Sequence, residues 1–352
     1  MDRYRVAVIA GDGVGREVIP AGMRVLDAVA SRDGSFALDW EELSWGSSYY
    51  RRHGRMMPED GLRILRGCDA IYLGAVGWPD VPDHVTLWGL LLPIRQRFNL
   101  YVNLRPVRLF PGVRSPLRDK GPDDIDMLCV RENTEGEYAG AGGRVHLGFG
   151  HEVAVQADIF TRTGVEQVVR YAFEQARGRR KHLTSVTKSN ASPYAFVFWD
   201  EVVAEVARDF PDVQMERILV DAAAAAFITR PESFDVVVAS NLFGDILTDL
   251  GAVIQGSMGL AASANIDPRG GYPGMFEPVH GSAPDIAGKG IANPLGAIWA
   301  GALMLENLGR AAAAERVIGA MAGSLERGEA LTRDLGGSAT TEQAAHAVIA
   351  AL

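Results

Sequence analysis

The segment RVAVIAGDGVGR (residues 5–16) decides between two α/β folds. Its apolar residues predict a buried strand over 5–10. The glycines that follow begin the dinucleotide-binding pattern G-x-G-x-x-G, but the sixth position is Arg16 instead of glycine. The segment therefore favours a tight turn from strand to helix over a loop that cradles a pyrophosphate.

Strand and helix patterns alternate along most of the chain, which predicts an α/β protein with a largely parallel sheet. Strands are expected at 5–10, 69–76, 124–130, 181–187, 217–221 and 234–240. Helices are expected at 16–31, 87–98, 162–177, 193–208, 241–255, 294–308, 311–326 and 340–351. The glycine-rich segment 137–155 alternates instead and predicts an antiparallel arm. Gly/Pro-rich loops are expected after residue 256.

The composition limits the classes of function. The 352 residues predict two domains, and the net charge of −9 argues against nucleic acid as a partner. No apolar run reaches the roughly 20 residues of a membrane span. The N-terminus has no export-signal pattern, so we expect a cytoplasmic protein. Cys68 and Cys129 show no metal-type spacing and are predicted to be reduced core thiols.

The segment SNLFGDILTDLGA (240–252) carries two acids on one helix face. Asp245 and Asp249 are four residues apart, so their carboxylates lie side by side and repel each other. A hydrated face and a divalent cation both account for the pair. Asp221 ends a predicted strand, where an acid either caps the next helix or supplies a third carboxylate. Spacing alone leaves these alternatives open.

Several charged or phenolic residues lie at predicted strand or helix ends. Arg95, Arg105 and Arg131 are each ordinary surface charges on their own, but together they suit a di- or tricarboxylate. Tyr138 is either a half-buried aromatic or a general acid. Lys188 is one of only four lysines among 35 basic residues and follows a strand, where α/β proteins place ligands.

The long segment FEPVHGSAPDIAGKGIANP (276–294) is unusual for a plain connection. It is either a structured Ω-type loop or a loop that grips a cofactor. In the second interpretation Asp285 accepts hydrogen bonds from a ribose diol.

These motifs together resemble the isocitrate/isopropylmalate dehydrogenase family, the β-decarboxylating 2-hydroxyacid dehydrogenases. The resemblance covers essentially the full length and rests on GDGVGREV, NLRPVRL, VRENTEGEY, TKSN, SNLFGDILTDLG and EPVHGSAPDIAGKGIANP. It implies that family's two-domain α/β sandwich with a protruding β arm, and not a Rossmann domain. Residues 1–100 and 252–352 would form the coenzyme-binding domain. Residues 101–251 would carry the substrate and metal residues, the dimer interface and the arm.

The resemblance also implies roles for individual residues. Asp221, Asp245 and Asp249 match the ligands of Mg²⁺ or Mn²⁺, while Arg95, Arg105 and Arg131 match the clamp for the substrate carboxylates. Tyr138 and Lys188 match the acid–base pair. Lys188 and Asp221 would reach the neighbouring subunit's site, which implies a homodimer. The coenzyme residues are His280, Gly281, Ser282, Ala283, Asp285 and Asn293, and an aspartate at 285 goes with NAD. A monovalent cation such as K⁺ is a further candidate cofactor.

The segment DHVTLWGLLLPIR (83–95) is most similar to the tartrate and D-malate dehydrogenase branch. Trp88, Leu91 and Leu92 would line the substrate pocket, and a small malate-like dicarboxylate is the expected substrate. The segment VDAAAAAFITRPESFD (220–235) is more similar to the isopropylmalate branch. It keeps 3-isopropylmalate or another 3-substituted malate open. Alternatives of another class are a non-catalytic regulatory subunit and a metal-dependent enzyme without redox chemistry.

Overall fold

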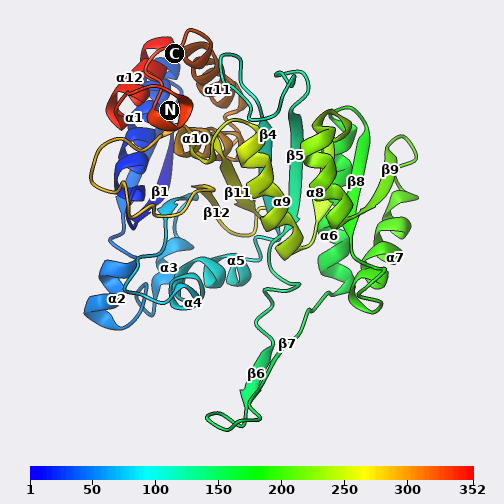
Figure 1. Ribbon diagram of the computed structural model, residues 1–352. Coiled ribbons are helices and arrows are strands. Elements are labelled where there is room, and N and C mark those ends of the chain that lie inside the picture. The colour runs from blue at the N-terminus through cyan, green and yellow to red at the C-terminus, as the bar shows by residue number, and fades with distance from the viewer.

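A ten-stranded mixed β-sheet runs through the whole computed structural model, which describes residues 1–352 (Figure 1). The strand order is β2-β1-β3-β12-β11-β4-β5-β10-β8-β9. The strands are β1 (Asp2–Gly11), β2 (Phe36–Glu42), β3 (Ala70–Ala75), β4 (Val102–Arg108), β5 (Asp126–Glu132), β8 (His182–Thr187), β9 (Gln214–Leu219), β10 (Val236–Ala239), β11 (Ala262–Ile266) and β12 (Gly274–Pro278).

The sheet consists of two parallel halves that meet at an antiparallel centre. Strands β2, β1, β3 and β12 pair in parallel, and so do β5, β10, β8 and β9. Strand β11 pairs antiparallel with both β12 and β4, and β4 pairs antiparallel with β5. The predicted α/β class is thus confirmed, and parallel pairing holds within each half but not at the centre.

Helices cover both faces of each half (Figure 1). They are α1 (Gly15–Asp33), α2 (Ser47–His53), α3 (Gly61–Leu65), α4 (Asp83–Thr86), α5 (Leu92–Arg97), α6 (Arg162–Arg177), α7 (Ala195–Ala207), α8 (Val220–Thr229), α9 (Asn241–Ile254), α10 (Leu295–Asn307), α11 (Ala311–Glu326) and α12 (Thr341–Ala351). Both chain ends lie with α1, α11 and α12 beside the first half (Figure 1). The division into a coenzyme-binding and a central domain stays a prediction.

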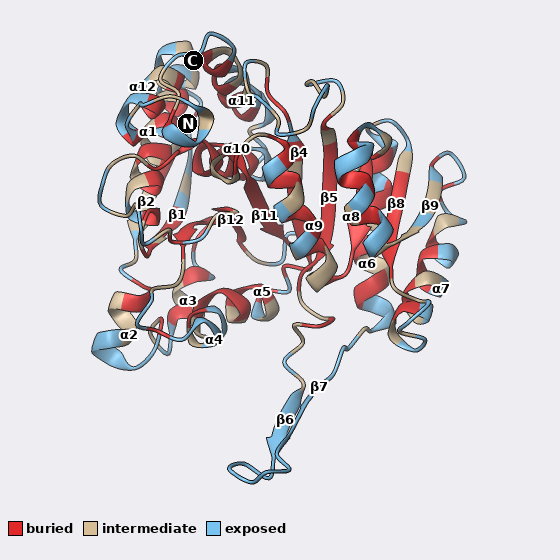
Figure 2. Cartoon of the chain, viewed as in Figure 1, coloured by how far each residue is buried: buried red, intermediate tan, exposed pale blue.

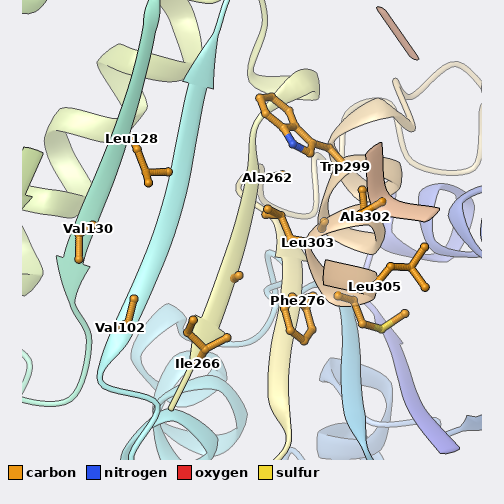
Figure 3. Packing of buried hydrophobic residues seen from close by; sticks show 14 of the residues in the cluster. Val102, Leu128, Val130, Ala262, Ile266, Phe276, Trp299, Ala302, Leu303 and Leu305 are labelled. Atoms are coloured by element: carbon orange, nitrogen blue, oxygen red, sulfur yellow. The ribbon is translucent and has the colours of Figure 1, made fainter. Parts of the chain in front are cut away.

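Alternation along the strands builds a separate core on each face. In β1, Val6 and Val8 contact the α1 and α10 side, whereas Ala7 and Ile9 contact the side of α2–α5. Figure 3 shows the first of these cores at the sheet centre, where Phe276 and Leu303 pack together. Figure 2 shows the strands as mostly buried between the helices. Cys68 and Cys129 are free and buried, as predicted.

The predicted arm is a two-stranded antiparallel hairpin that projects away from the sheet (Figures 1 and 2). It consists of β6 (Gly142–Val145) and β7 (Val153–Gln156). Its side chains are exposed, including the apolar Leu147, Phe149 and Val155. No helix of the structure is both long and apolar enough to cross a membrane.

Two expectations about local structure were wrong. The segment after residue 256 is not only loop, because β11 and β12 are buried strands. Asp221 does not end a strand: β9 stops at Leu219, and Asp221 lies in the first turn of α8, where the alanine run favours helix and an acid suits the helix dipole. The helix predicted over 87–98 is confirmed, and its first turn, Leu87–Leu91, is π-helical before α5 begins.

Candidate active site

Polar side chains form a row across the antiparallel centre of the sheet. Asn103 and Arg105 are two residues apart on β4 and therefore face the same side. Ser263 of β11 pairs with Glu277 of β12, and Asn265 of β11 pairs with Asn103. All five are buried. A central strand pair that would normally carry apolar side chains thus carries hydrogen-bonding groups instead.

A cavity of about 290 Å³ lies over this row. It brings together most residues that the sequence singled out: Arg95, Arg105, Arg131, Tyr138, Asp245, Trp88, Leu91, Leu92, His280 and Gly281. The arginines come from α5, β4 and β5, and the apolar residues from the π-helical turn and α5. Three cations, one phenol and two carboxylates, Asp245 and Glu277, therefore share a pocket whose remaining wall is largely apolar.

Asp245 of α9 is the carboxylate that holds two of these arginines. Arg131 forms an ion pair with it, and the Nη2 atom of Arg105 lies 3.2 Å from its Oδ1. Arg131 also donates to Oδ1 of Asn241 from Nε at 3.0 Å and from Nη2 at 2.7 Å. Burial by itself would raise the pKa of Asp245, but the two arginines outweigh burial and hold that pKa below its usual value.

Arg95 is held by residues that sequence analysis did not identify. Its Nη2 donates to Oε1 of Glu277 at 2.8 Å, and both side chains are buried. Glu277 also accepts a hydrogen bond from Nδ2 of Asn265 at 2.9 Å. The Nε of Arg95 is buried without a partner beside the cavity. An anionic ligand in the cavity would supply the acceptor that this nitrogen lacks.

Tyr138 lines the cavity, and its hydroxyl is held by Asp245. The hydroxyl donates to Oδ2 of Asp245 at 3.3 Å, and its backbone oxygen accepts from Nε2 of Gln96 at 3.1 Å. The Arg131 guanidinium lies 5.7 Å from the ring centroid. Burial, and then the negative charge of Asp245, raise the pKa of the phenol. The phenol is therefore protonated near neutral pH and able to donate a proton.

The three predicted metal ligands, Asp221, Asp245 and Asp249, do not come together within one chain. Asp249 is one turn beyond Asp245 on α9, and burial together with the Asp245 charge raises its pKa. Asp221 instead accepts a hydrogen bond from the Nζ of Lys188 at 2.7 Å, and neither of these two residues lines the cavity. No three His, Cys, Asp or Glu side chains of one chain are grouped to hold a metal ion.

A second cavity of about 540 Å³ adjoins the first, because His280 lines both. Of the predicted coenzyme residues, it contains His280, Ala283, Asp285 and Asn293. Burial lowers the pKa of His280, and its Nε2 has no hydrogen-bond partner. Gly281 lines only the first cavity, and Ser282 lines neither.

Ser282 instead fixes the loop to the 11–15 turn. Its backbone oxygen accepts a hydrogen bond from the Val14 amide at 2.9 Å. Gly13 has a φ of +52°, and a Cβ there would lie 1.9 Å from the same oxygen. The Asp12 amide donates to the backbone oxygen of Ala75 at 2.7 Å. Because the protein itself occupies these amides, the segment is a tight turn from strand to helix, as predicted, and it is hydrogen-bonded to the 276–294 loop.

Comparisons with known proteins agree over the whole chain. Residues 5–348 match the family model described as isocitrate/isopropylmalate dehydrogenase. A probable tartrate dehydrogenase/decarboxylase of Agrobacterium vitis is 53% identical and covers 100% of this chain and 98% of its own. The D-malate dehydrogenase (decarboxylating) of Escherichia coli is 53% identical, with coverage of 99% and 98%. A crystal structure of isocitrate dehydrogenase from Methylococcus capsulatus has a TM-score of 0.89, 35% identity and coverage of 99% of each chain.

Proposed function

The chain belongs to the isocitrate/isopropylmalate dehydrogenase family, and we propose that it oxidises a small malate-like 2-hydroxy dicarboxylate, of the D-malate or tartrate type, with loss of CO₂. The relatives of about half-identical sequence are named as decarboxylating dehydrogenases of tartrate and D-malate. The observation that carries the proposal is the joint placement of three arginines, Tyr138 and Asp245 in one cavity.

The lining of this cavity favours a short dianion. Two carboxylates are matched by Arg95, Arg105 and Arg131, whose planar guanidinium groups bind carboxylates in a bidentate manner. Trp88 and Leu91 occupy the space that a larger substituent on the substrate would need. A cavity of about 290 Å³ lies at the lower end of the range for ligand pockets.

The second cavity is proposed to bind NAD. Ala283 and Ile286 offer apolar contact, and Asp285 offers a carboxylate to the hydroxyls of a ribose. A phosphate on that ribose would meet the negative charge of Asp285, so NAD is favoured over NADP. His280 lines both cavities, which supports a coenzyme whose reactive end reaches the substrate.

The paired acids fit a divalent cation such as Mg²⁺ or Mn²⁺. Asp245 and Asp249 are carboxylates on adjacent turns, and burial together with the nearby Asp245 charge raises the pKa of Asp249 despite Arg105 and Arg131. Hard cations take oxygen ligands of this kind. The third carboxylate would be the partner subunit's Asp221. Bound together, the cation and NAD supply polarisation of the hydroxyl and acceptance of the hydride.

The residues of the chain then bind the substrate and move its protons. The arginines hold both carboxylates, so the hydroxyl-bearing carbon is oriented toward the coenzyme cavity. The partner subunit's Lys188 takes the hydroxyl proton at Nζ. After hydride transfer and loss of CO₂, the Tyr138 hydroxyl donates a proton to the carbon that carried the carboxylate. The products are a keto acid, CO₂ and reduced coenzyme.

A homodimer is proposed because Lys188 and Asp221 lie outside the cavity of their own chain. Helices α8 and α9 expose Ile228, Ile246 and Val253, and the arm exposes a further set of apolar side chains. Such exposed apolar surface is typical of an interface. A second copy would cover it and bring Lys188 and Asp221 to the neighbouring cavity. A cytoplasmic location likewise stays a proposal.

The test is formation of NADH, followed at 340 nm with Mg²⁺ or Mn²⁺ present. D-malate, L-tartrate, meso-tartrate, 3-isopropylmalate and isocitrate are compared, each with NADP⁺ and with EDTA as controls. We expect EDTA-sensitive turnover of D-malate or a tartrate with NAD⁺. Turnover of 3-isopropylmalate alone would keep the reaction class and contradict the substrate. Absence of turnover with every acid would contradict the proposed function.

A further inference from the structure

One contact beside the cavity has no role in the proposed chemistry and yet limits the position of a cavity residue. The indole of Trp88 lies directly against Gly140, two residues beyond Tyr138. A Cβ built on Gly140 would lie 2.4 Å from Cη2 of Trp88 and 2.9 Å from Cζ3. Real Cβ atoms do not approach other carbons that closely, so any side chain at residue 140 would force the indole to move.

The backbone around this contact is fixed from both sides. Gly140 has a φ of +78°, and the backbone oxygen of Tyr138 accepts from Gln96, which lies on α5. Gly89, next to Trp88 in the chain, packs against Met56, and a Cβ on Gly89 would lie 2.5 Å from Cγ of Met56. The segment that carries Trp88 is thus held between Met56 and the base of the arm, and it cannot simply retreat.

The indole of Trp88 can move toward solvent. Trp88 is 42% exposed, although it lines the cavity beside Leu91 and Leu92. Its backbone belongs to the π-helical turn Leu87–Leu91, an irregularity that is often found at functional sites. A group that pushes on the ring from Gly140 would therefore rotate it outward and widen the apolar end of the cavity.

We propose that Gly140 determines substrate specificity. Because Gly140 has no side chain, the indole of Trp88 packs directly on its Cα, and in this position the indole closes the cavity against bulky substituents on the substrate. The inference rests on the proposed function, because the excluded group is the one carried by the carbon next to the hydroxyl-bearing carbon. Hydrogen or hydroxyl at that carbon is accepted. A branched alkyl group at that carbon collides with the Trp88 indole packed on Gly140.

The experiment compares kcat/KM for D-malate, L-tartrate and 3-isopropylmalate in the wild type and in Gly140→Ala, each as the full-length holoenzyme with NAD⁺ and Mn²⁺. We expect the ratio of 3-isopropylmalate to D-malate to rise about tenfold or more, within the range known for hydrophobic pockets that differ by a few methylenes. Gly309→Ala is the matched control. Gly309 has a φ of +77°, and a Cβ added there would have no atom within 4 Å, so this variant carries the backbone strain without the contact.

A double-mutant cycle isolates the effect of the contact between Gly140 and Trp88. In Trp88→Ala the ring is absent, so adding Gly140→Ala should change the substrate ratio less than twofold. If Gly140→Ala shifts the ratio equally in both backgrounds, or leaves it unchanged in the wild-type background, the inference is wrong. If Gly140→Ala fails to fold, Trp88→Phe, which lacks the Cη2 atom, must shift the substrate ratio in the same direction. An unchanged ratio in Trp88→Phe also contradicts the proposed role of the Gly140–Trp88 contact.

The outcomes separate this inference from the function on which it rests. If the wild type turns over D-malate or tartrate and Gly140→Ala has unaltered selectivity, only the proposed role of Gly140 is refuted. A wild-type enzyme that is inactive on every acid refutes the proposed function, and the inference with it.

Discussion

Replacing Glu277 by glutamine tests whether the buried polar row sustains the fold as well as the site. Glu277 and Arg95 expose 9% and 5% of their side chains and are joined by a 2.8 Å contact. The change keeps the size of the side chain and one acceptor oxygen, but it removes the only carboxylate paired with Arg95. A buried guanidinium then remains without a neutralising charge.

The expected loss of stability follows from that burial. Breaking a buried ion pair from one side costs about 3–5 kcal/mol, and we take about 3 kcal/mol because the glutamine oxygen still accepts a hydrogen bond. Unfolding entropy of about 2.1 cal/mol/K per residue gives about 0.7 kcal/mol/K for a chain of 352 residues. The melting temperature of Glu277→Gln should therefore fall by about 4 °C.

Differential scanning calorimetry measures this shift. Asp39→Asn is the control, since it removes a pair with Arg3 whose side chains are 45% and 65% exposed, and such an exposed pair contributes little to stability. Added D-malate should raise the melting temperature of Glu277→Gln more than that of the wild type, because a substrate carboxylate supplies the missing charge to Arg95. A melting temperature equal to that of Asp39→Asn would refute the reasoning.

Three further predictions concern charge, assembly and thiols. The pKa of Asp245 is held below its usual value, so its ion pairs stabilise the fold above about pH 4 and are lost as pH falls below that; the urea midpoint of the wild type should fall more steeply than that of Asp245→Asn between pH 5 and pH 3, and parallel profiles would contradict the assignment. Ile246 is 53% exposed on α9, so Ile246→Glu should shift the protein from dimer to monomer in analytical ultracentrifugation, with a strong loss of activity; a variant that stays dimeric places the interface elsewhere. Burial raises the pKa of Cys129 to about 12 and also raises that of Cys68, so a thiol reagent at pH 8 should react with neither in the native protein and with both in urea; rapid native labelling would contradict their burial.

Much of the architecture could be predicted because its periodicity is regular. Helix α6 has the predicted bounds 162–177, since its apolar residues repeat at helical spacing and Thr161 caps it. The arm was predictable from alternation and glycine. The site residues of the cavity were predictable only as a set, because a single arginine in the sequence is interpreted as a surface charge, whereas all three are buried in the structure.

The errors have physical causes. Strands β11 and β12 were missed because Asn265, Ser263 and Glu277 are polar yet buried, and a pattern based on hydrophobicity cannot detect a strand whose partners are other polar groups. The signal that could have found them is polar residues at alternate positions in short apolar segments. Asp221 was misplaced because the alanine run that follows it extends the helix toward the N-terminus.

Other features depend on tertiary contacts or on a second chain. The contact between Trp88 and Gly140 joins residues that are distant in the sequence, so no local sequence pattern predicts it. Lys188 and Asp221 contact each other in the structure, and their role depends on where a second subunit lies. Sequence resemblance supplied that role.

The most direct test of the central claim is complementation between two inactive variants. The Lys188→Met subunit keeps an intact cavity but cannot supply Lys188 to the cavity of its partner. The Asp245→Asn subunit has a defective cavity but can still supply Lys188. When equal amounts are unfolded together and refolded, about half of the dimers are mixed, and each mixed dimer contains one intact site. We predict that the mixture forms NADH from D-malate at about a quarter of the wild-type rate, while each variant alone is inactive. A mixture as inactive as its components would contradict a site that is shared between two subunits.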